Sequence, residues 1–522
     1  MRGMAPRPML DEVARDRRGW FGDAPAMRSV QLAPPRNTFR QRSLALFVGQ
    51  LAVCGVAMAA PMRSAPPART DVPAPWIIEG GAPNGIVGLT VATADVDGDG
   101  YADVVSSQQL ADPVSGAARD SIVLVYYGSA NGPQLPPQQI ANPAAADGFD
   151  YFGENVASAG DVNGDGYEDI IVDDERGTDP GNPNGFDFRG TVYLFLGSAT
   201  GLSPTPAARL VGDDIDGCKF GFGLSGIGDV NGDGYDDVAI GENSTNPVLP
   251  ETVFVYYGSP QGLVESARTR LSAQTTTASF GFAVRGAGDV NGDGYDDLVV
   301  GAPGYQYQTS GGGAFVYLGS PNGIVTDPAT VLTGDTSQGD FGFAAVGVGD
   351  LDGDGYDDVM IGTDCEPTPA AGCDFLSFPG AAWLFRGGAD GLASPAAVKL
   401  TLASGDGTPA SFGVHIEPAG DFDGDGHPDV AITALQYDGL GSVMIYRGPL
   451  DATSTPATVI ADPSASLSLY GLRFAFGDVD GDHRLDAVVG AGFYNADAEG
   501  AIFVYPNRDP DLVFADGFDS SP

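Results

Sequence analysis

Residues 280–303 read FGFAVRGAGDVNGDGYDDLVVGAP, and their acidic centre, Asp289 to Asp297, recurs along the chain. Matching nine-residue segments begin at six other aspartates: Asp95, Asp161, Asp229, Asp350, Asp421 and Asp478. The steps between successive copies are 66, 68, 60, 61, 71 and 57 residues. Regular self-similarity of this kind is typical of repeat architectures, so the fold has to be read from the repeated unit.

Each acidic segment lies among short apolar runs, which one copy displays most clearly. These runs are residues 280–284, 297–303, 313–320 and 329–334, rich in Val, Phe and Tyr and bounded by Gly, Pro or Asp. They predict four antiparallel strands, named A to D here, of about five to seven residues each. Most of the third runs are apolar throughout, which indicates strands buried on both faces. Four-stranded units repeated radially predict an all-β, seven-bladed β-propeller.

The two ends of the array distinguish a closed ring from a solenoid. The seventh copy supplies strands near 472–477, 485–490 and 502–505 and then continues into a polar tail without a fourth strand. An extra apolar segment, residues 73–80, precedes the first copy and resembles the fourth runs 206–212 and 328–334. We therefore expect this N-terminal strand to complete the last blade, whereas a solenoid would cap its ends instead.

The acidic segments have the side-chain pattern of cation-binding loops. Positions 1, 3, 5 and 9 carry Asp or Asn in every copy, and position 7 would offer its backbone carbonyl. The candidate ligands are Asp95, Asp97, Asp99, Tyr101, Asp103; Asp161, Asn163, Asp165, Tyr167, Asp169; Asp229, Asn231, Asp233, Tyr235, Asp237; Asp289, Asn291, Asp293, Tyr295, Asp297; Asp350, Asp352, Asp354, Tyr356, Asp358; Asp421, Asp423, Asp425, His427, Asp429; and Asp478, Asp480, Asp482, Arg484, Asp486. Several carboxylates in so short a loop repel one another strongly without a cation.

Calcium is the ion that these loops predict. Hard oxygen ligands at alternating positions suit Ca²⁺, which accepts 6 to 8 oxygens, whereas Mg²⁺ demands stricter octahedral geometry. An EF-hand is excluded because position 12 is apolar, as at Val172 and Val300, and because the flanks read as strands. We expect up to seven Ca²⁺ ions, with the seventh loop the weakest because His483 replaces glycine at position 6. Solvated Asp/Gly turns are the alternative.

Charge divides the chain into a basic leader and an acidic body. The 522 residues carry 69 acids and 25 bases, a net charge of -44, yet residues 1–60 alone carry +5. Within this leader, residues 43–59 form an apolar run that ends in the small-residue motif Ala57-Met58-Ala59, as in a signal peptide. We expect export after cleavage, with no membrane span left in the mature chain. The remaining boundaries are a linker at 61–72, the propeller at 73–506 and an acidic tail at 507–522.

The cysteines and the tail allow smaller predictions. Cys365 and Cys373 flank a Pro/Ala-rich segment and would close a small disulfide loop in an oxidising compartment. Cys218 is expected to be buried and inert. The tail, Asp511 to Asp519, resembles short acidic, Phe-containing C-termini of exported bacterial proteins, with a frayed end as the alternative.

The repeats resemble the FG-GAP repeat of the integrin alpha-subunit propeller and its bacterial relatives. The resemblance rests on Phe-Gly pairs nine residues before five of the loops (Phe152, Phe220, Phe280, Phe341 and Phe412) and on Gly301-Ala302-Pro303. Two copies depart from it: Ile86-Val87 stands at the expected place in the first, and Tyr470-Gly471 lies at a shorter offset in the seventh. The resemblance implies Ca²⁺ in hairpins between strands A and B on one face, and partner binding on the opposite face.

These observations favour a binding module over an enzyme. The net charge makes nucleic acids poor partners, and no Gly-x-Ser-x-Gly, Walker or dinucleotide motif is present. We expect a monomer that binds a surface protein or a glycan, or that serves cell adhesion, through the variable loops between strands B and C. The alternative is a calcium-dependent polysaccharide lyase or hydrolase, which a basic or aromatic cluster at the ring centre would favour. The sequence reveals no such cluster, and His415 is expected to be a strand residue.

Overall fold

The computed structural model describes residues 74–80, 85–111, 118–144, 152–174, 189–213, 218–244, 251–272, 278–306, 311–335, 339–365, 379–402, 410–437, 440–463, 469–494 and 499–507. The expected leader and linker, and nearly all of the tail, lie outside these ranges. All regular structure in the described part of the chain is β-strand. The predicted all-β class is therefore confirmed.

In the described part of the chain, twenty-eight strands form seven four-stranded antiparallel sheets. Blade 1 contains β2 (Gly85–Ala94), β3 (Asp103–Ala111), β4 (Ala118–Tyr126) and β5 (Gln138–Ala141). Blade 2 contains β6 (Phe152–Gly160), β7 (Asp169–Asp174), β8 (Thr191–Phe195) and β9 (Ala208–Val211). Blade 3 contains β10 (Cys218–Gly228), β11 (Asp237–Ser244), β12 (Thr252–Tyr256) and β13 (Arg268–Ser272). Blade 4 contains β14 (Val284–Gly288), β15 (Asp297–Ala302), β16 (Gly313–Tyr317) and β17 (Thr330–Thr333).

The remaining three blades follow the same plan. Blade 5 contains β18 (Ala344–Gly349), β19 (Asp358–Thr363), β20 (Ala381–Phe385) and β21 (Val398–Thr401). Blade 6 contains β22 (Phe412–Gly420), β23 (Asp429–Tyr437), β24 (Leu440–Tyr446) and β25 (Thr458–Ala461). Blade 7 contains β26 (Phe474–Gly477), β27 (Asp486–Ala491), β28 (Ala501–Tyr505) and the N-terminal β1 (Trp76–Glu79).

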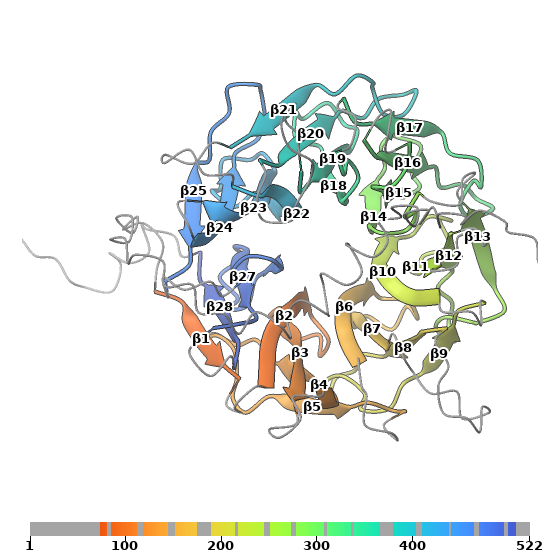
Figure 1. Ribbon diagram of the computed structural model, residues 1–522. Coiled ribbons are helices and arrows are strands. Elements are labelled where there is room, and N and C mark those ends of the chain that lie inside the picture. Colours follow the sequence, from red (N-terminus) through yellow and green to blue (C-terminus); the bar gives the residue numbers. More distant parts are fainter. Residues whose placement is uncertain are drawn as a thin grey trace, which may run out of the picture. The chain divides into compact units, whose positions relative to one another are not determined.

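The sheets close into a ring through the N-terminal strand. β1 pairs antiparallel with β28, with Ile78 opposite Ile502. The first strands of neighbouring blades contact one another all the way round, including β26 with β2 (Figure 1). The predicted seven-bladed propeller, with its last blade completed from the N-terminus, is confirmed, and the solenoid is excluded.

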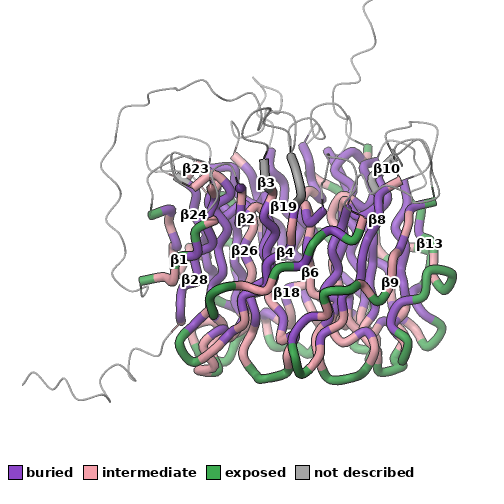
Figure 2. Tube along the Cα trace, turned by 90° about the horizontal axis from the view of Figure 1, so that it is seen from below, coloured by how far each residue is buried: buried purple, intermediate pink, exposed green. Residues whose placement is uncertain are grey.

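The core lies between the blades. The third strands β8, β12, β16, β20 and β28 are buried at every residue, as their apolar runs predicted. Exposed residues gather in the connections at one end of the blades (Figure 2). Because successive strands are antiparallel, this end carries the A–B and C–D connections, and the B–C and D–A connections belong to the opposite end.

The Phe-Gly pairs explain why the blades fit together. Phe152 is fully buried and packs edge-on against Tyr193 of its own blade, with ring centroids 6.1 Å apart. Gly342 has φ +91°, and a Cβ there would lie 2.1 Å from the Gly313 carbonyl oxygen of the preceding blade. The phenylalanine thus fills the interface between blades, while the glycine allows the preceding backbone to approach.

The first blade uses a different pair from the one expected. The buried Val87 and Gly88, with φ +78°, stand in the Phe-Gly place, not Ile86 and Val87. Val87 bridges Gly500 in parallel, as Phe341 bridges Gly312. The offset to the acidic loop is therefore one residue shorter than in the five middle blades.

This packing gives a matched pair of glycine substitutions. Gly342 and Gly166 both have φ +91°, but no atom lies within 4 Å of a Cβ at Gly166. Both Gly→Ala changes carry the cost of a positive φ, about 1–2 kcal/mol, and only Gly342→Ala adds a backbone clash. We expect Gly342→Ala to lower the free energy of unfolding by at least about 2 kcal/mol more than Gly166→Ala. Chemical denaturation measures the difference, and equal losses would contradict the packing role.

Candidate metal centre

Each acidic loop is organised by its first aspartate. In blade 2, Asp161 Oδ1 accepts hydrogen bonds from the N–H groups of Gly164 (2.7 Å) and Asp165 (3.0 Å), and Oδ2 accepts one from Gly166 (2.8 Å). The loop of Asp229 repeats these bonds at 2.7, 3.1 and 2.8 Å. The glycines have positive φ, which lets the chain curl tightly around one carboxylate.

The ninth residue fixes each loop to its blade. Asp169 is fully buried, and its two carboxylate oxygens accept the N–H groups of Val162 (3.2 Å) and of Gly197 after β8 (2.8 Å). The same paired contact occurs at Asp237 and Asp297. Position 9 therefore has a structural role of its own, in addition to the ligand role predicted for it.

The carboxylates converge enough to hold a cation. Ligand atoms lie within 4.8 Å of one another in four groups: Asp95, Asp97 and Asp99; Asp350, Asp352 and Asp354; Asp421, Asp423 and Asp425; and Asp478, Asp480 and Asp486. In the other three loops, position 3 is an asparagine. Asp97 Oδ1 and Asp352 Oδ1 are screened from solvent and accept no hydrogen bond within the described part of the chain. A buried carboxylate oxygen without a donor fits a loop that holds a cation.

The raised pKa values of the aspartates at position 9 also agree with a cation in the loop. Burial raises the pKa of Asp103, Asp169, Asp297 and Asp486 to about 7 and that of Asp237 to about 8. Burial likewise raises the pKa of Asp358 and Asp429 to about 6. The protein alone thus disfavours the ionised form of these buried groups, and a nearby cation would favour it.

The residues at positions 6 and 7 behave differently from the simple loop pattern. His483 takes φ +67° where the other loops have glycine, and its N–H still bonds to Asp478 Oδ2 at 2.8 Å. The seventh loop therefore keeps its shape despite the substitution. The Tyr167 ring at position 7 packs against Gly98 of the preceding loop, where a Cβ would lie 2.7 Å from it.

Neighbouring loops are joined round much of the ring. The position-8 carboxylates of blades 2 to 5 accept the first N–H of the preceding loop: Glu168 from Asp95 (3.0 Å), Asp236 from Asp161 (2.7 Å), Asp296 from Asp229 (2.9 Å) and Asp357 from Asp289 (2.9 Å). Pro428 stands at this position in blade 6 and offers no such acceptor. A change in the conformation of one loop can thus alter a hydrogen bond of the neighbouring loop.

Sequence reasoning missed a polar cluster on the innermost strands. Arg285 of β14 reaches Glu417 of β22 at 3.3 Å, past β18, whose side chains are small. His415 Nε2 lies 3.1 Å from Glu417 Oε1. Burial and Arg285 lower the pKa of Arg473 to about 10. The cluster unites residues from blades 4, 6 and 7, so only the closed ring reveals it.

The same innermost layer carries an aromatic arc. Phe222, Phe282 and Phe343 directly follow the Phe-Gly pairs of blades 3, 4 and 5 and are half-buried. Their ring centroids lie 5.1 Å and 4.7 Å apart in succession. The basic and aromatic groups that the sequence did not reveal are thus present in the innermost strands or directly before them.

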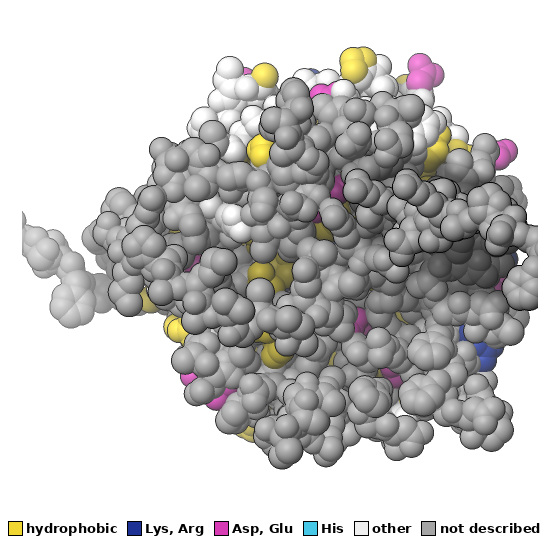
Figure 3. Space-filling model, viewed as in Figure 1, with side chains coloured by type: hydrophobic (Ala, Val, Ile, Leu, Met, Phe, Trp, Pro, Cys, Tyr) yellow, Lys and Arg dark blue, Asp and Glu magenta, His cyan; other side chains and the backbone are white. Residues whose placement is uncertain are grey.

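The connections between strands B and C contain several aromatic residues, which are only partly described. Tyr305 packs against Phe315 with centroids 5.1 Å apart, and Tyr494 packs against Phe503 at 5.3 Å. Both rings therefore pack on their own blades. Phe186, Phe188, Tyr307, Phe375 and Phe378 lie outside the described residues. On the face seen in Figure 3, described acidic side chains appear at several separate places.

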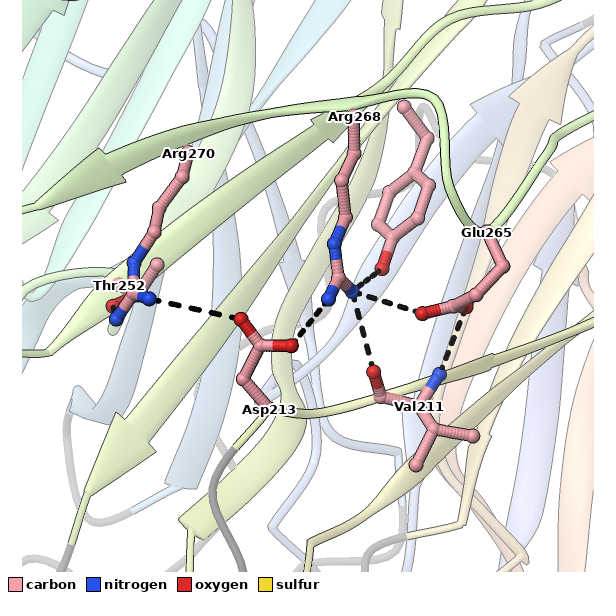
Figure 4. A network of polar contacts seen from close by, with 7 residues as sticks. Val211, Asp213, Thr252, Glu265, Arg268 and Arg270 are labelled. Atoms are coloured by element: carbon pink, nitrogen blue, oxygen red, sulfur yellow. Dashed lines mark hydrogen bonds and ion pairs between the residues drawn. The ribbon is translucent and has the colours of Figure 1, made fainter.

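Other polar contacts are structural. Arg268 joins the outer edges of blades 2 and 3 by bonding to Glu265 (3.0 Å), to the Val211 carbonyl (3.3 Å) and to Asp213 (Figure 4). Cys365 is disulfide-bonded, and its expected partner Cys373 lies outside the described residues. Within those ranges, no helix is long and apolar enough to cross a membrane.

Comparison with known proteins agrees with the repeat pattern. The FG-GAP repeat model matches residues 280–318 and 342–373, and the FG-GAP-like repeat model matches 421–489. Integrin alpha-PS2 of Drosophila melanogaster is 34% identical over 227 residues, which are 41% of this chain and 15% of that protein. Integrin alpha-V of Gallus gallus is 32% identical over 221 residues, 41% of this chain and 20% of that protein.

Similarity to solved structures is weaker. Exotype rhamnogalacturonan lyase YesX aligns over 84% of this chain and 75% of that chain, with 12% identity and a TM-score of 0.37. We take neither fold nor activity from it. The chain spans only 15% and 20% of the length of these two integrin relatives. The repeats and the seven blades together show a β-propeller that contains FG-GAP repeats and is similar to integrin alpha chains.

Proposed function

We propose that this protein is an exported, calcium-stabilised propeller that binds a surface protein or a glycan. Support for calcium comes chiefly from Asp97 Oδ1 and Asp352 Oδ1, two buried carboxylate oxygens that accept no hydrogen bond within the described part of the chain. Asp97 is intermediate in burial within a loop that already contains three other aspartates, and the pKa of its carboxyl is raised by burial and by Asp99. When bound, the ion would supply positive charge and tie positions 1, 3, 5, 7 and 9 together.

The role of the loops points to the place of the partner site. Each loop joins strands A and B of one blade, and the loops of blades 1 to 4 bond to the next loop, so the ions would stabilise the ring at that end. The opposite end carries the B–C connections, whose sequences vary most between copies. Variable connections on a rigid scaffold are where binding usually lies.

Replacing one B–C connection at a time with a glycine-serine linker tests the partner face. Binding of each variant to intact cells and to a glycan array is compared with binding of the parent chain. We expect at least one replacement to abolish binding while the melting temperature stays unchanged. If only changes at the A–B loops abolish binding, the partner lies on the calcium face.

Two substitutions in the fourth loop distinguish an aspartate that would only bind the ion from one that also holds the loop to its blade. Asp293→Ala should remove one Ca²⁺ with little change of stability in chelator, because the Asp293 carboxylate accepts only exposed hydrogen bonds from Asn291 and Tyr295 of its own loop. Asp297→Ala should also destabilise the calcium-free protein by about 2 kcal/mol, because it leaves two buried N–H groups without an acceptor. Calorimetric stoichiometry and denaturation in chelator measure both effects. An unchanged stoichiometry for Asp293→Ala would remove this loop from the calcium sites.

The inner-strand cluster favours a second candidate, a polysaccharide lyase or hydrolase. Arg285 and Arg473 would bind a carboxylate group of an acidic sugar, and the arc of Phe222, Phe282 and Phe343 would stack on sugar rings. Asp340 and Asp364 add a buried carboxyl pair, in which burial and the neighbouring carboxyl raise the pKa of Asp340. Incubation with acidic polysaccharides, followed by a reducing-end assay, tests this candidate. Cleavage that Arg285→Gln abolishes would support it, and no cleavage would leave the binding module.

A further inference from the structure

Two arginines stand where other blades have neutral residues. The ninth aspartate of each loop accepts one N–H from the chain that follows strand C, or β28 in blade 7. The place in question is the residue directly before that N–H donor. It is occupied, in blade order, by Tyr127, Leu196, Tyr257, Leu318, Arg386, Arg447 and Pro506. The hydrogen bonds that follow it make these seven residues equivalent without any reliance on sequence spacing.

Both arginines pair with the third position of the acidic loop in their own blade. Arg386 Nη1 lies 2.8 Å from Asp352 Oδ2, and the Arg386 side chain is 39% exposed. Arg447 Nε contacts Asp423 Oδ2 in the same way. Asp352 and Asp423 are 15% and 19% exposed, so each guanidinium covers a carboxylate that is itself largely buried.

The ligand aspartates and the paired arginines give the second to sixth loops the same charge. In blades 2 to 4, position 3 is asparagine, and the Asn163 amide donates to Asp165 Oδ2 at 3.0 Å. These loops carry three ligand aspartates each, a charge of -3. In blades 5 and 6, four aspartates and one arginine also give -3. The first loop has four aspartates and the neutral Tyr127, whose hydroxyl accepts the N–H of Leu202 in the next blade.

We propose that Arg386 and Arg447 are resident counter-ions that hold the calcium affinity of the fifth and sixth loops below that of the first. This inference rests on the proposed calcium role. A guanidinium beside a ligand carboxylate repels an incoming Ca²⁺ and at the same time reduces repulsion among the aspartates when no ion is bound. Among these three four-aspartate loops, the first would then depend most on its ion and the fifth and sixth less.

The substitution Arg386→Leu tests this directly, because leucine occupies the equivalent position in blades 2 and 4. We expect calcium affinity at one site to rise roughly tenfold in a competitive chelator titration. Thermal stability should change in opposite directions: lower than the parent in chelator, and equal or higher in saturating calcium. Arg447→Leu should repeat the result in blade 6. Arg270→Leu, which removes the same charge from the outer strand β13, should leave calcium affinity unchanged.

The outcomes separate this inference from the proposal beneath it. A parent chain that binds no calcium would overturn the calcium role itself. Calcium binding by the parent with unchanged affinity in Arg386→Leu would overturn only the counter-ion inference. A weaker site in Arg386→Leu would instead make Arg386 a positioning residue that holds Asp352 in place for the ion.

Discussion

Removal of calcium from the intact protein should lower its melting temperature by roughly 10 °C or more. A ligand that binds only the folded state stabilises it by about 2.7 kcal/mol per site at a hundredfold excess over Kd. Several such sites act on one cooperative ring, so their contributions add. Calorimetric titration of chelator-stripped protein, with thermal unfolding followed in parallel, measures both the number of sites and the stabilisation.

The contacts between loops explain why the effect should spread beyond each hairpin. Glu168 of the second loop accepts the first N–H of the loop before it, and Asp236 and Asp296 do the same in the next two blades. A loop that loosens without its ion therefore releases an acceptor from its neighbour. We expect the stripped protein to unfold over a broader temperature range than the calcium-bound protein.

Magnesium serves as the control ion. Because the loops offer flexible carboxylate and carbonyl oxygens, they suit the larger ion better, and Mg²⁺ at the same concentration should restore only a small part of the stability. Calcium binding without any gain in melting temperature would contradict a structural role. Little binding of any kind would mean that the acidic segments are solvated turns.

The repeat pattern predicted the fold because the relevant information is local. Each blade repeats the same order of apolar runs, and the acidic loop marks one hairpin in every copy. The unpaired segment before the first copy sufficed to predict ring closure, which the pairing of β1 with β28 confirms. The place of Val87 and Gly88 was mispredicted by one residue, because fixed spacing could not reveal the shorter connection in the first blade.

What the sequence could not predict depends on contacts between distant blades. Arg285 and Glu417 are 132 positions apart in the sequence. They come into contact only when blades 4 and 6 lie on either side of blade 5. No sequence motif marks Arg386. Its proposed role depends on its short distance to Asp352 and on the neutral residues at the equivalent position in other blades. Side chains whose role is set by neighbouring blades thus require the three-dimensional structure.

The substitution Ile78→Asp should open the ring. Ile78 is 6% exposed and lies opposite Ile502 in the strand pair that closes blade 7. Burial of an unpaired carboxylate at this place, together with the lost apolar contact, should cost about 4 kcal/mol. Detachment of β1 would also expose the apolar edge of β28, and an open edge of that kind favours aggregation.

The neighbouring residue supplies the control. Ile77 is 48% exposed on the same strand, so Ile77→Asp should change the free energy of unfolding by less than about 0.5 kcal/mol. Denaturation measures both variants, and light scattering follows aggregation. If closure by β1 holds the ring together, only Ile78→Asp will lose the cooperative transition, because both substitutions add the same charge to the same strand. Equal, small effects would mean that the other six blades maintain the ring without its closing strand.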